Sequence, residues 1–292
     1  MNKQSRTYLL LPLIPILWGF NVVAARVAML EIHPAWGALL RFSLALLLFL
    51  LVLRRIPPVK PLPLFILLAL TGVAGFNLLI FWGIRLATAT DAAVISAVYP
   101  LTVALTHAFW FRQRLLPAVL AGMIVSGLGV VILTLGHATF SETGGWQRVL
   151  GDVLLIAAAL SWGIYSTGMT VVSTLHPPFE ATAGAILLGI LLLIPVVWLS
   201  KLPLPEASSR AWLGLLYTAI GGSFTAFALW SHLLSKLPTP TVASVLNFTP
   251  VVALLASVFL LNEKLIRTDY AGMALIFGGV SWSQLAYLKK RN

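Results

Sequence analysis

The sequence predicts an all-α membrane protein with ten transmembrane helices. Hydrophobic residues make up 60% of the 292 residues and charged residues only 9%, whereas about 25% of the residues in an ordinary soluble domain are charged. The mean hydropathy of +0.99 over the whole chain leaves no segment polar enough for a soluble domain. Scanning for runs of roughly 20 apolar residues, the length that crosses hydrocarbon about 30 Å thick, gives ten candidates.

The ten apolar runs follow one another with short connections. They cover residues 8–30, 34–53, 62–84, 91–111, 116–136, 149–172, 179–199, 211–234, 240–261 and 268–288. The first run follows Lys3 and Arg6, as the apolar part of a signal peptide would. Because it is about twice as long as the usual apolar region of a signal peptide, we expect a retained helix.

Lys and Arg in the short loops favour an orientation with both termini in the cytoplasm. Eleven basic residues then lie inside: Lys3, Arg6, Arg54, Arg55, Lys60, Arg112, Arg114, Lys236, Lys289, Lys290 and Arg291. Six lie outside: Arg85, Arg148, Lys201, Arg210, Lys264 and Arg267.

The formal charge of +11 does not indicate a nucleic-acid partner, because the Lys and Arg residues are dispersed between apolar stretches. Lipid headgroups and the bilayer are the expected partners. The chain has no cysteine, which excludes disulfides, iron–sulfur clusters and thiolate zinc sites. We also expect no metal and no cofactor, because no P-loop and no His-Glu-x-x-His motif is present.

The two halves of the sequence resemble each other. At a shift of 150, residues 91–130 align with 241–280, so that Pro100 meets Pro250 and Gly122 meets Gly272. At a shift of 144, Trp18-Gly19 meets Trp162-Gly163. Each copy contains five spans, and five is odd, so the second copy must cross the membrane in the opposite direction. We expect residues 1–137 and 149–292 to form inverted repeats joined by a linker at 138–148, an architecture typical of secondary transporters.

Specific motifs in both halves resemble the EamA-type repeat of the drug/metabolite transporter superfamily. The opening Trp18-Gly19-Phe20-Asn21-Val22-Val23-Ala24 resembles the start of that repeat, and Leu261-Asn262-Glu263-Lys264-Leu265 resembles its close. The first half departs from the family with Arg112-Gln113-Arg114 where a glutamate is usual. The resemblance implies ten helices and export of small metabolites across the bacterial inner membrane, with bacterial amino-acid exporters as similar proteins.

The acidic residues argue against several functions. All eight fall in loops or within a turn of a predicted span end: Glu31, Asp91, Glu142, Asp152, Glu180, Glu206, Glu263 and Asp269. Proton-coupled cation exporters and intramembrane aspartyl proteases need a carboxylate near the midplane. A membrane-embedded lipid-modifying enzyme would need clustered His, Asp or Glu at one membrane face, and no such cluster is present. We therefore expect a transporter and no enzyme.

Aromatic and amide side chains within the spans are the candidate substrate-binding residues. Trp18 and Asn21 lie three residues apart on the first span, and the repeat places Trp162 and Tyr165 at the equivalent positions of the sixth, so we expect the two pairs to face each other. Further candidates are Asn77, Phe81, Tyr99, Phe227, Ser244 and Asn247. For any one aromatic residue, helix packing is the alternative explanation.

Three further residues have candidate roles in transport. Arg41 lies roughly 10 Å from the end of the second span, deep enough to attract a substrate carboxylate, with packing as the alternative. Pro100 and Pro250 interrupt the fourth and ninth spans at equivalent points and are candidate hinges, although prolines also set static curvature.

A pocket of Trp, Tyr, Phe and Asn suits an apolar side chain with a zwitterionic head group. We expect export of an amino acid with an aromatic or large apolar side chain by alternating access. The alternative transporter is a multidrug exporter of lipophilic cations, which the missing membrane carboxylate disfavours.

Overall fold

Helices account for all the regular structure that the described residues contain. A computed structural model describes residues 7–86, 95–136, 146–261 and 265–291, and no strand occurs in these ranges. In chain order the helices are α2 (Leu13–Met29), α3 (Pro34–Leu53), α4 (Leu62–Leu68), η1 (Ala69–Ala74), α5 (Gly75–Leu86), α7 (Tyr99–Trp110), α8 (Pro117–Gly136), α9 (Trp146–Val172), α10 (Pro178–Leu199), α11 (Ser209–Tyr217), η2 (Thr218–Thr225), α12 (Ala226–Lys236), α13 (Thr239–Ser244), η3 (Val245–Phe248), α14 (Thr249–Leu261) and α15 (Arg267–Arg291).

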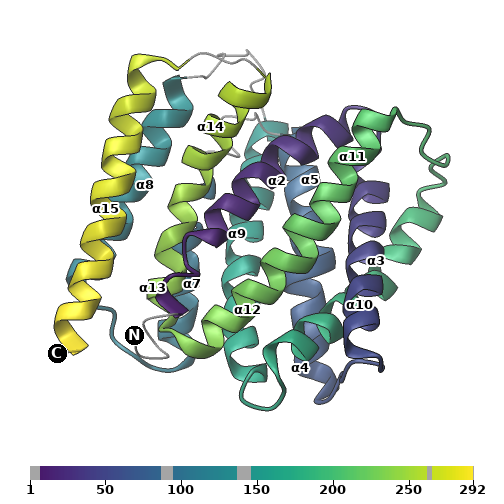
Figure 1. Ribbon diagram of the computed structural model, residues 1–292, viewed down its shortest axis with the longest axis horizontal. Coiled ribbons are helices and arrows are strands. Elements are labelled where there is room, and N and C mark those ends of the chain that lie inside the picture. The colour runs from purple at the N-terminus through teal and green to yellow at the C-terminus, as the bar shows by residue number, and fades with distance from the viewer. Residues whose placement is uncertain (1–6, 87–94, 137–145, 262–264, 292) are drawn as a thin grey trace.

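The helices run roughly alongside one another, and the start of α2 lies at the same end as the last turn of α15 (Figure 1). Six helical segments are long and apolar enough to cross a membrane: Pro34–Leu53, Leu62–Ile80, Trp146–Val172, Pro178–Leu199, Ser209–Lys236 and Thr239–Leu260. Leu13–Met29 and Pro117–Leu133 are shorter apolar helices. These segments confirm the prediction of an all-helical protein with several membrane spans.

Each predicted span contains helix, and two of the predicted limits differ from the observed ones by more than three residues. The first helix, α2, begins at Leu13, because residues 9–12 form turns rather than helix. Helix α7 begins at Tyr99, well inside the predicted span 91–111, of which residues 91–94 lie outside the described ranges.

Two composite helices contain a π-helical segment at matching places in the two halves. Ala69–Ala74 (η1) separates α4 from α5, and Thr218–Thr225 (η2) separates α11 from α12. Adding 150 to the limits of η1 gives 219–224, which falls inside η2. Such segments are rare and often occur at functional sites.

The two candidate hinge prolines occupy matching positions at helix starts. Pro100 is the second residue of α7, and Pro250 is the second residue of α14, directly after the 3₁₀ segment η3. Proline is well tolerated there, because the first N–H groups of a helix have no partner within it. In each of the two spans, the break in the α-helix therefore lies before the proline rather than at it.

Besides a small group formed by Ala28, Ile32, Ala211 and Leu215, two larger groups of buried side chains form the interior. The larger one lies among α2, α3, α9, α10 and α12 and contains most of the buried aromatic rings. The smaller one lies among α8, α14 and α15 and consists of aliphatic side chains such as Val130, Leu133, Leu254 and Ile276. Helices α8 and α15 lie side by side, away from most of the others (Figure 1).

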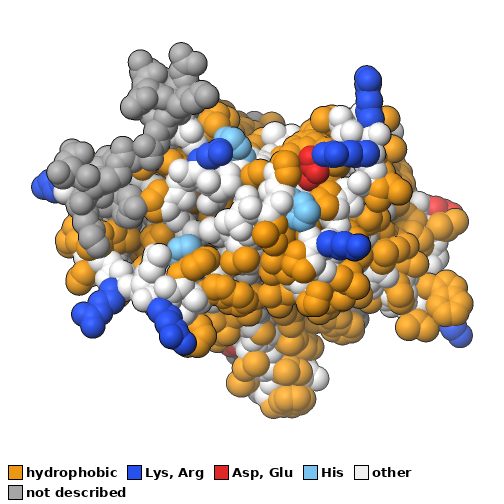
Figure 2. Space-filling view, turned by 90° about the horizontal axis from the view of Figure 1, so that it is seen from below, with side chains coloured by type: hydrophobic (Ala, Val, Ile, Leu, Met, Phe, Trp, Pro, Cys, Tyr) orange, Lys and Arg blue, Asp and Glu red, His pale blue; other side chains and the backbone are white. Residues whose placement is uncertain are grey.

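Basic and acidic residues are distributed unequally between the two ends of the helices. Figure 2 views the end that carries the start of α2 and shows Lys and Arg side chains spread around an otherwise largely apolar face. The loops and helix ends there include Arg54, Arg55, Lys60, Arg112, Arg114 and Lys236. Of the acidic residues that the structure describes, only Glu180 belongs to this end, at the start of α10.

Polar contacts at both ends join segments that are far apart in the sequence. At one end, the Glu31 carboxylate accepts hydrogen bonds from the backbone N and the hydroxyl of Ser208, at 2.6 and 2.8 Å. These bonds lower the pKa of Glu31. At the other end, the Arg55 guanidinium forms an ion pair with Glu180.

Candidate functional site

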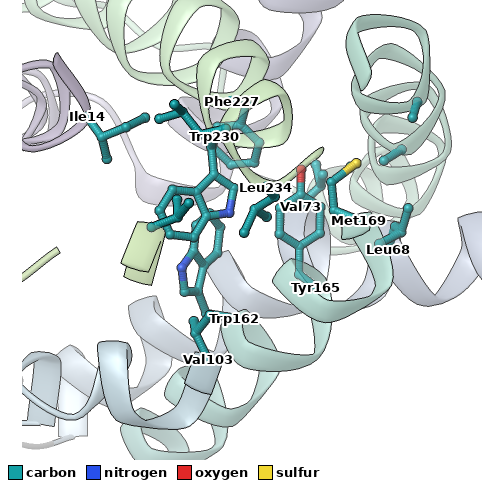
Figure 3. Packing of buried hydrophobic residues seen from close by; sticks show 14 of the residues in the cluster. Ile14, Leu68, Val73, Val103, Trp162, Tyr165, Met169, Phe227, Trp230 and Leu234 are labelled. Atoms are coloured by element: carbon teal, nitrogen blue, oxygen red, sulfur yellow. The ribbon is translucent and has the colours of Figure 1, made fainter. Parts of the chain in front are cut away.

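Eight aromatic side chains form a continuous group between the two halves of the chain, which we call the aromatic cluster. Its members are Trp18, Phe42, Phe76, Tyr99, Trp162, Tyr165, Phe227 and Trp230. Figure 3 shows four of them, Trp162, Tyr165, Phe227 and Trp230, gathered between α9 and α12. Ring pairs at such distances contribute about 0.5–1.5 kcal/mol each beyond the burial of their area.

Trp18 and Trp162, which the repeat makes equivalent, are in direct contact. Their ring centroids are 5.4 Å apart and their planes are inclined at 78°. Trp162 is the centre of the cluster, because it also contacts Phe76, Tyr165, Phe227 and Trp230 at 5.1 to 5.8 Å. The structure thus brings the two tryptophans, one from α2 and one from α9, into edge-to-face contact.

Two indole N–H groups of the cluster already donate hydrogen bonds within the protein. Trp18 Nε1 donates to the carbonyl of Gly222 in η2 at 3.1 Å, and Trp230 Nε1 donates to Ser166 Oγ at 3.2 Å. These bonds fix two ring orientations. Both tryptophans therefore present ring faces rather than free donors to the space around them.

Two polar atoms beside the cluster are buried without a hydrogen-bond partner, at positions that the repeat makes equivalent. They are Asn21 Oδ1 and the Tyr165 hydroxyl. Ser231, a polar neighbour of Tyr165, already donates to the Phe227 carbonyl and accepts from Thr182. Leaving a buried acceptor or donor unpaired costs about 1–3 kcal/mol, so each atom is suited to pair with a polar group of a ligand.

Glycines in the two π-helical segments allow these two side chains to lie where they do. A Cβ atom on Gly72 would lie 2.1 Å from Cδ2 of Tyr165, and one on Gly222 would lie 2.0 Å from Oδ1 of Asn21. No larger residue fits at either point without displacing the side chain opposite.

Tyr99 and Asn77 lie near the cluster but contribute differently. Tyr99 joins it through Phe76, whose ring centroid is 6.1 Å away. Asn77 is buried, and its Nδ2 donates to the carbonyl of Val73 one turn earlier in the same helix. The side chain of Phe81 lies outside what the structure describes.

Arg41 is a cation within α3 that has no acidic partner among the described residues. Its Nε is buried and makes no hydrogen bond. Its guanidinium carbon lies 4.5 Å from the ring centroid of Phe42, and the Phe42 ring lies 5.7 Å from that of Phe227. Two rings, Phe42 and Phe227, therefore lie between Arg41 and Trp162 at the centre of the cluster.

The side chains of Ser244 and Asn247 form hydrogen bonds with α15 and α8 rather than with members of the aromatic cluster. Gln284 Nε2 of α15 donates to Ser244 Oγ at 2.8 Å, and Asn247 Nδ2 donates to Ser126 Oγ of α8 at 2.7 Å. Both residues bridge the segment α13–η3 to the α8–α15 pair.

Sequence reasoning missed three members of the cluster, namely Phe42, Phe76 and Trp230. Phe42 and Trp230 are both completely buried. Helical spacing offered a usable signal for Trp230, because it follows Phe227 by three residues. A candidate residue and its neighbour one turn away share a helix face.

The cluster can bind through ring faces and hydrogen bonds. Among the residues that the structure describes, no three His, Asp or Glu side chains come together to hold a metal ion. The described groups around the rings are hydroxyls, amides and one guanidinium. Such a set suits a small molecule that combines an apolar body with a polar end.

Comparisons with known proteins agree with this architecture. The sequence matches the EamA-like transporter family twice, over residues 5–135 and 149–284. It is 29% identical over 280 residues to a protein of Salmonella typhimurium named "Probable amino-acid metabolite efflux pump", covering 92% of this chain and 91% of that protein. It is 26% identical to the "Probable terminal-alkyne amino-acid exporter" of Streptantibioticus cattleyicolor, covering 95% of this chain and 93% of that protein.

A solved crystal structure shares the fold. It superposes with a TM-score of 0.84 at 22% sequence identity and covers 99% of each chain. The matching family consists of transporters, and the two relatives above are named as probable efflux pumps or exporters, not as enzymes. With both matches together spanning most of its length, this multi-span membrane protein belongs to the EamA-like transporter family.

Proposed function

We propose that the protein is a ten-span carrier that exports an amino acid with an aromatic or large apolar side chain across the bacterial inner membrane by alternating access. The observation that carries this proposal is the aromatic cluster, in which the repeat-equivalent Trp18 and Trp162 meet beside two unpaired buried polar atoms. The names of the relatives, which include an amino-acid metabolite efflux pump and an amino-acid exporter, support both the direction and the substrate class.

Contacts between the halves support two inverted repeats, residues 1–137 and 149–292, joined by residues 138–148. Gly19 packs against Val252, and the equivalent Gly163 packs against Thr102. Gly72 packs against Tyr165, just as Gly222 packs against Asn21. Contacts that recur in this exchanged form are those that a twofold axis between the halves produces, and carriers with inverted repeats bind substrate at such an axis.

The charge distribution supports cytoplasmic termini. The end that carries the start of α2 and the end of α15 has most of the basic loops and, among the described acidic residues, only Glu180. An excess of Lys and Arg in short loops marks the cytoplasmic side.

Each part of an amino-acid substrate has a matching group. The rings of Trp18, Trp162 and Phe227 suit an apolar side chain, and the Asn21 Oδ1 acceptor suits an ammonium group. The Tyr165 hydroxyl and Arg41 are donors without an acidic partner among the described residues, so they suit a carboxylate. Charge-assisted hydrogen bonds of this type are about twice as strong as neutral ones.

The proposal is tested by counterflow in vesicles reconstituted with the purified full-length protein. Vesicles loaded with unlabelled phenylalanine, leucine, alanine, phenylethylamine or a lipophilic cation are mixed with the same compound in labelled form. We expect saturable uptake of label with phenylalanine and leucine, at a lower half-saturating concentration than with alanine, because the rings contact large side chains.

Arg41→Gln separates carboxylate recognition from packing in the same assay. It should raise the half-saturating concentration for phenylalanine by roughly tenfold, because hydrogen bonds to charged groups contribute about 1.5–3 kcal/mol. Phenylethylamine, which lacks the carboxylate, should be unaffected by the substitution if it is carried at all. Counterflow of the lipophilic cation with none of any amino acid would overturn the proposal in favour of a multidrug exporter.

A further inference from the structure

A groove opens on the outside of the helices between the start of α3 and the end of α10, which are neighbours at the right of Figure 1. Its volume is about 440 Å³, within the range of pockets that hold small molecules. Trp36 and Leu39 line it from α3, Ile194 and Trp198 line it from α10, and Lys201 lies at the end of α10. None of these residues belongs to the aromatic cluster.

The groove has hydrogen-bond donors at one end and apolar walls below them. Helices α3 and α10 run in opposite directions, so Trp36 near the start of α3 and Lys201 just beyond the end of α10 lie at the same level. Leu39 lies three residues further along α3 and Ile194 five residues before the end of α10. At 1.5 Å per residue, the apolar wall continues about 4–8 Å deeper.

Both donors lack a partner among the described residues. Trp36 Nε1 is buried and makes no hydrogen bond. Lys201 is exposed, and none of the ion pairs or side-chain hydrogen bonds in the described part of the chain involves its ammonium group. Trp36 as a whole is half-buried, and a buried indole N–H without a partner is unusual, because tryptophan normally pairs its polar atom.

The apolar side chains that line the groove favour a lipid over a polar metabolite as its ligand. Ile194 is 47% exposed and Trp198 is 78% exposed, on an apolar helix long enough to cross a membrane. Pro195 lies inside α10 beside Ile194, and proline inside a helix removes a backbone hydrogen bond and bends the helix. In a bilayer, phospholipids surround this face of the protein and can enter the groove from the side.

We propose that this groove binds an anionic phospholipid of the leaflet at this end of the protein. One acyl chain packs along Leu39 and Ile194, and phosphate oxygens accept hydrogen bonds from Lys201 and from Trp36 Nε1. A headgroup with a negative charge satisfies both donors. A zwitterionic headgroup brings its own cation close to Lys201, so it binds less tightly.

The test is native mass spectrometry of the purified full-length protein titrated with phosphatidylglycerol or phosphatidylcholine. We expect Lys201→Gln to weaken phosphatidylglycerol binding by about fivefold, the effect of one basic residue near an anionic lipid, and to leave phosphatidylcholine binding unchanged. Trp36→Phe keeps the ring and removes the donor, so it should weaken phosphatidylglycerol binding by a smaller factor. Ile194→Trp fills the groove and should abolish the tightest binding of both lipids.

Lys60→Gln is the matched control, because Lys60 is an exposed lysine at the opposite end. An equal loss of phosphatidylglycerol binding in Lys60→Gln and Lys201→Gln would show general charge attraction and overturn the proposal. Unchanged binding in both Lys201→Gln and Ile194→Trp would overturn it as well. Thermal melting of each variant in detergent verifies that the protein is folded.

Discussion

The α8–α15 pair and the aromatic cluster both connect the two halves of the chain. The pair does so through glycines, and the cluster does so through large aromatic side chains. In the pair, Gly122 faces Gly279 and Gly129 faces Gly272, with backbone atoms in contact. A Cβ atom on Gly279 would lie 2.4 Å from the backbone N of Ser126 and 2.6 Å from the carbonyl oxygen of Gly122. Small residues that let backbones touch are typical of tightly associated membrane helices.

The aromatic cluster connects the halves through side chains that can change rotamer. Rings meet at 5.1 to 6.2 Å, and the helices that carry or contact them include the two π-helical segments. Backbone contacts allow little adjustment, whereas ring contacts can be exchanged for contacts with a ligand. We therefore expect the pair to hold the halves together and, under the proposed function, the cluster to contact the substrate.

The largest effect should come from adding one methyl group to the pair. Gly279→Ala forces a Cβ against backbone on two sides, and overpacking costs about 1–3 kcal/mol. We expect the melting temperature in detergent to fall by roughly 6–12 °C, taking the upper end of that cost at about 2–4 °C per kcal/mol.

The neighbouring Gly278 provides the control for this substitution, because a Cβ there has no atom within 4 Å. Gly278→Ala should leave the melting temperature unchanged or slightly higher, since alanine favours helix more than glycine does. Equal melting temperatures for the two variants would contradict the distinction between the pair and the cluster.

The second effect concerns transport rather than folding. Trp18→Ala and Trp162→Ala remove rings from the cluster, and one lost ring contact should weaken substrate binding by up to about tenfold. We expect export per folded molecule to fall, more for phenylalanine than for alanine.

Trp146→Ala is the control for the tryptophan variants, because Trp146 is 72% exposed and lies outside the cluster. Its export should equal that of the parent protein. Parental export of every substrate by folded Trp18→Ala and Trp162→Ala proteins would show that these rings only pack helices.

A smaller effect should separate binding from packing at a single hydroxyl. Tyr165→Phe removes a buried group that has no hydrogen-bond partner, so the melting temperature should stay level or rise slightly. The half-saturating substrate concentration should rise by about two- to tenfold, the usual range for one lost hydrogen bond.

Tyr217→Phe should show the opposite pattern, because Tyr217 donates to the carbonyl of Leu17 at 3.3 Å. It should lower the melting temperature slightly and leave the half-saturating concentration unchanged. If both variants lower only the melting temperature, the Tyr165 hydroxyl does not contact substrate.

The smallest effect belongs to a loop contact that lies outside both regions. Hydrogen bonds from Ser208 lower the pKa of Glu31, so the folded protein favours the ionised carboxylate. That stabilisation is present above the ordinary pKa of glutamate, about 4.3, and is lost as the pH falls through the lowered value. Between pH 7 and pH 3, the melting temperature should therefore decrease less for Glu31→Gln than for the parent protein. Identical pH dependence in both proteins would exclude the contact as the cause.

The sequence by itself determined the membrane class, the approximate position of most spans and five of the eight members of the aromatic cluster. Apolar composition is a local property, and a helix in hydrocarbon must satisfy its own backbone hydrogen bonds, so a run of about 20 apolar residues suffices to predict a helix. The repeat then paired Trp18 with Trp162, and the structure brings those two rings into contact.

Only the tertiary structure decided which face of each helix turns inward. It brought Phe42 and Trp230 into the cluster and turned Ser244 and Asn247 toward α15 and α8. In a soluble protein, apolar residues that recur about every 3.6 residues mark the buried face of a helix. In this chain, lipid and protein interior are both apolar, so the pattern carries little information about rotation, and contacts between distant helices determine it.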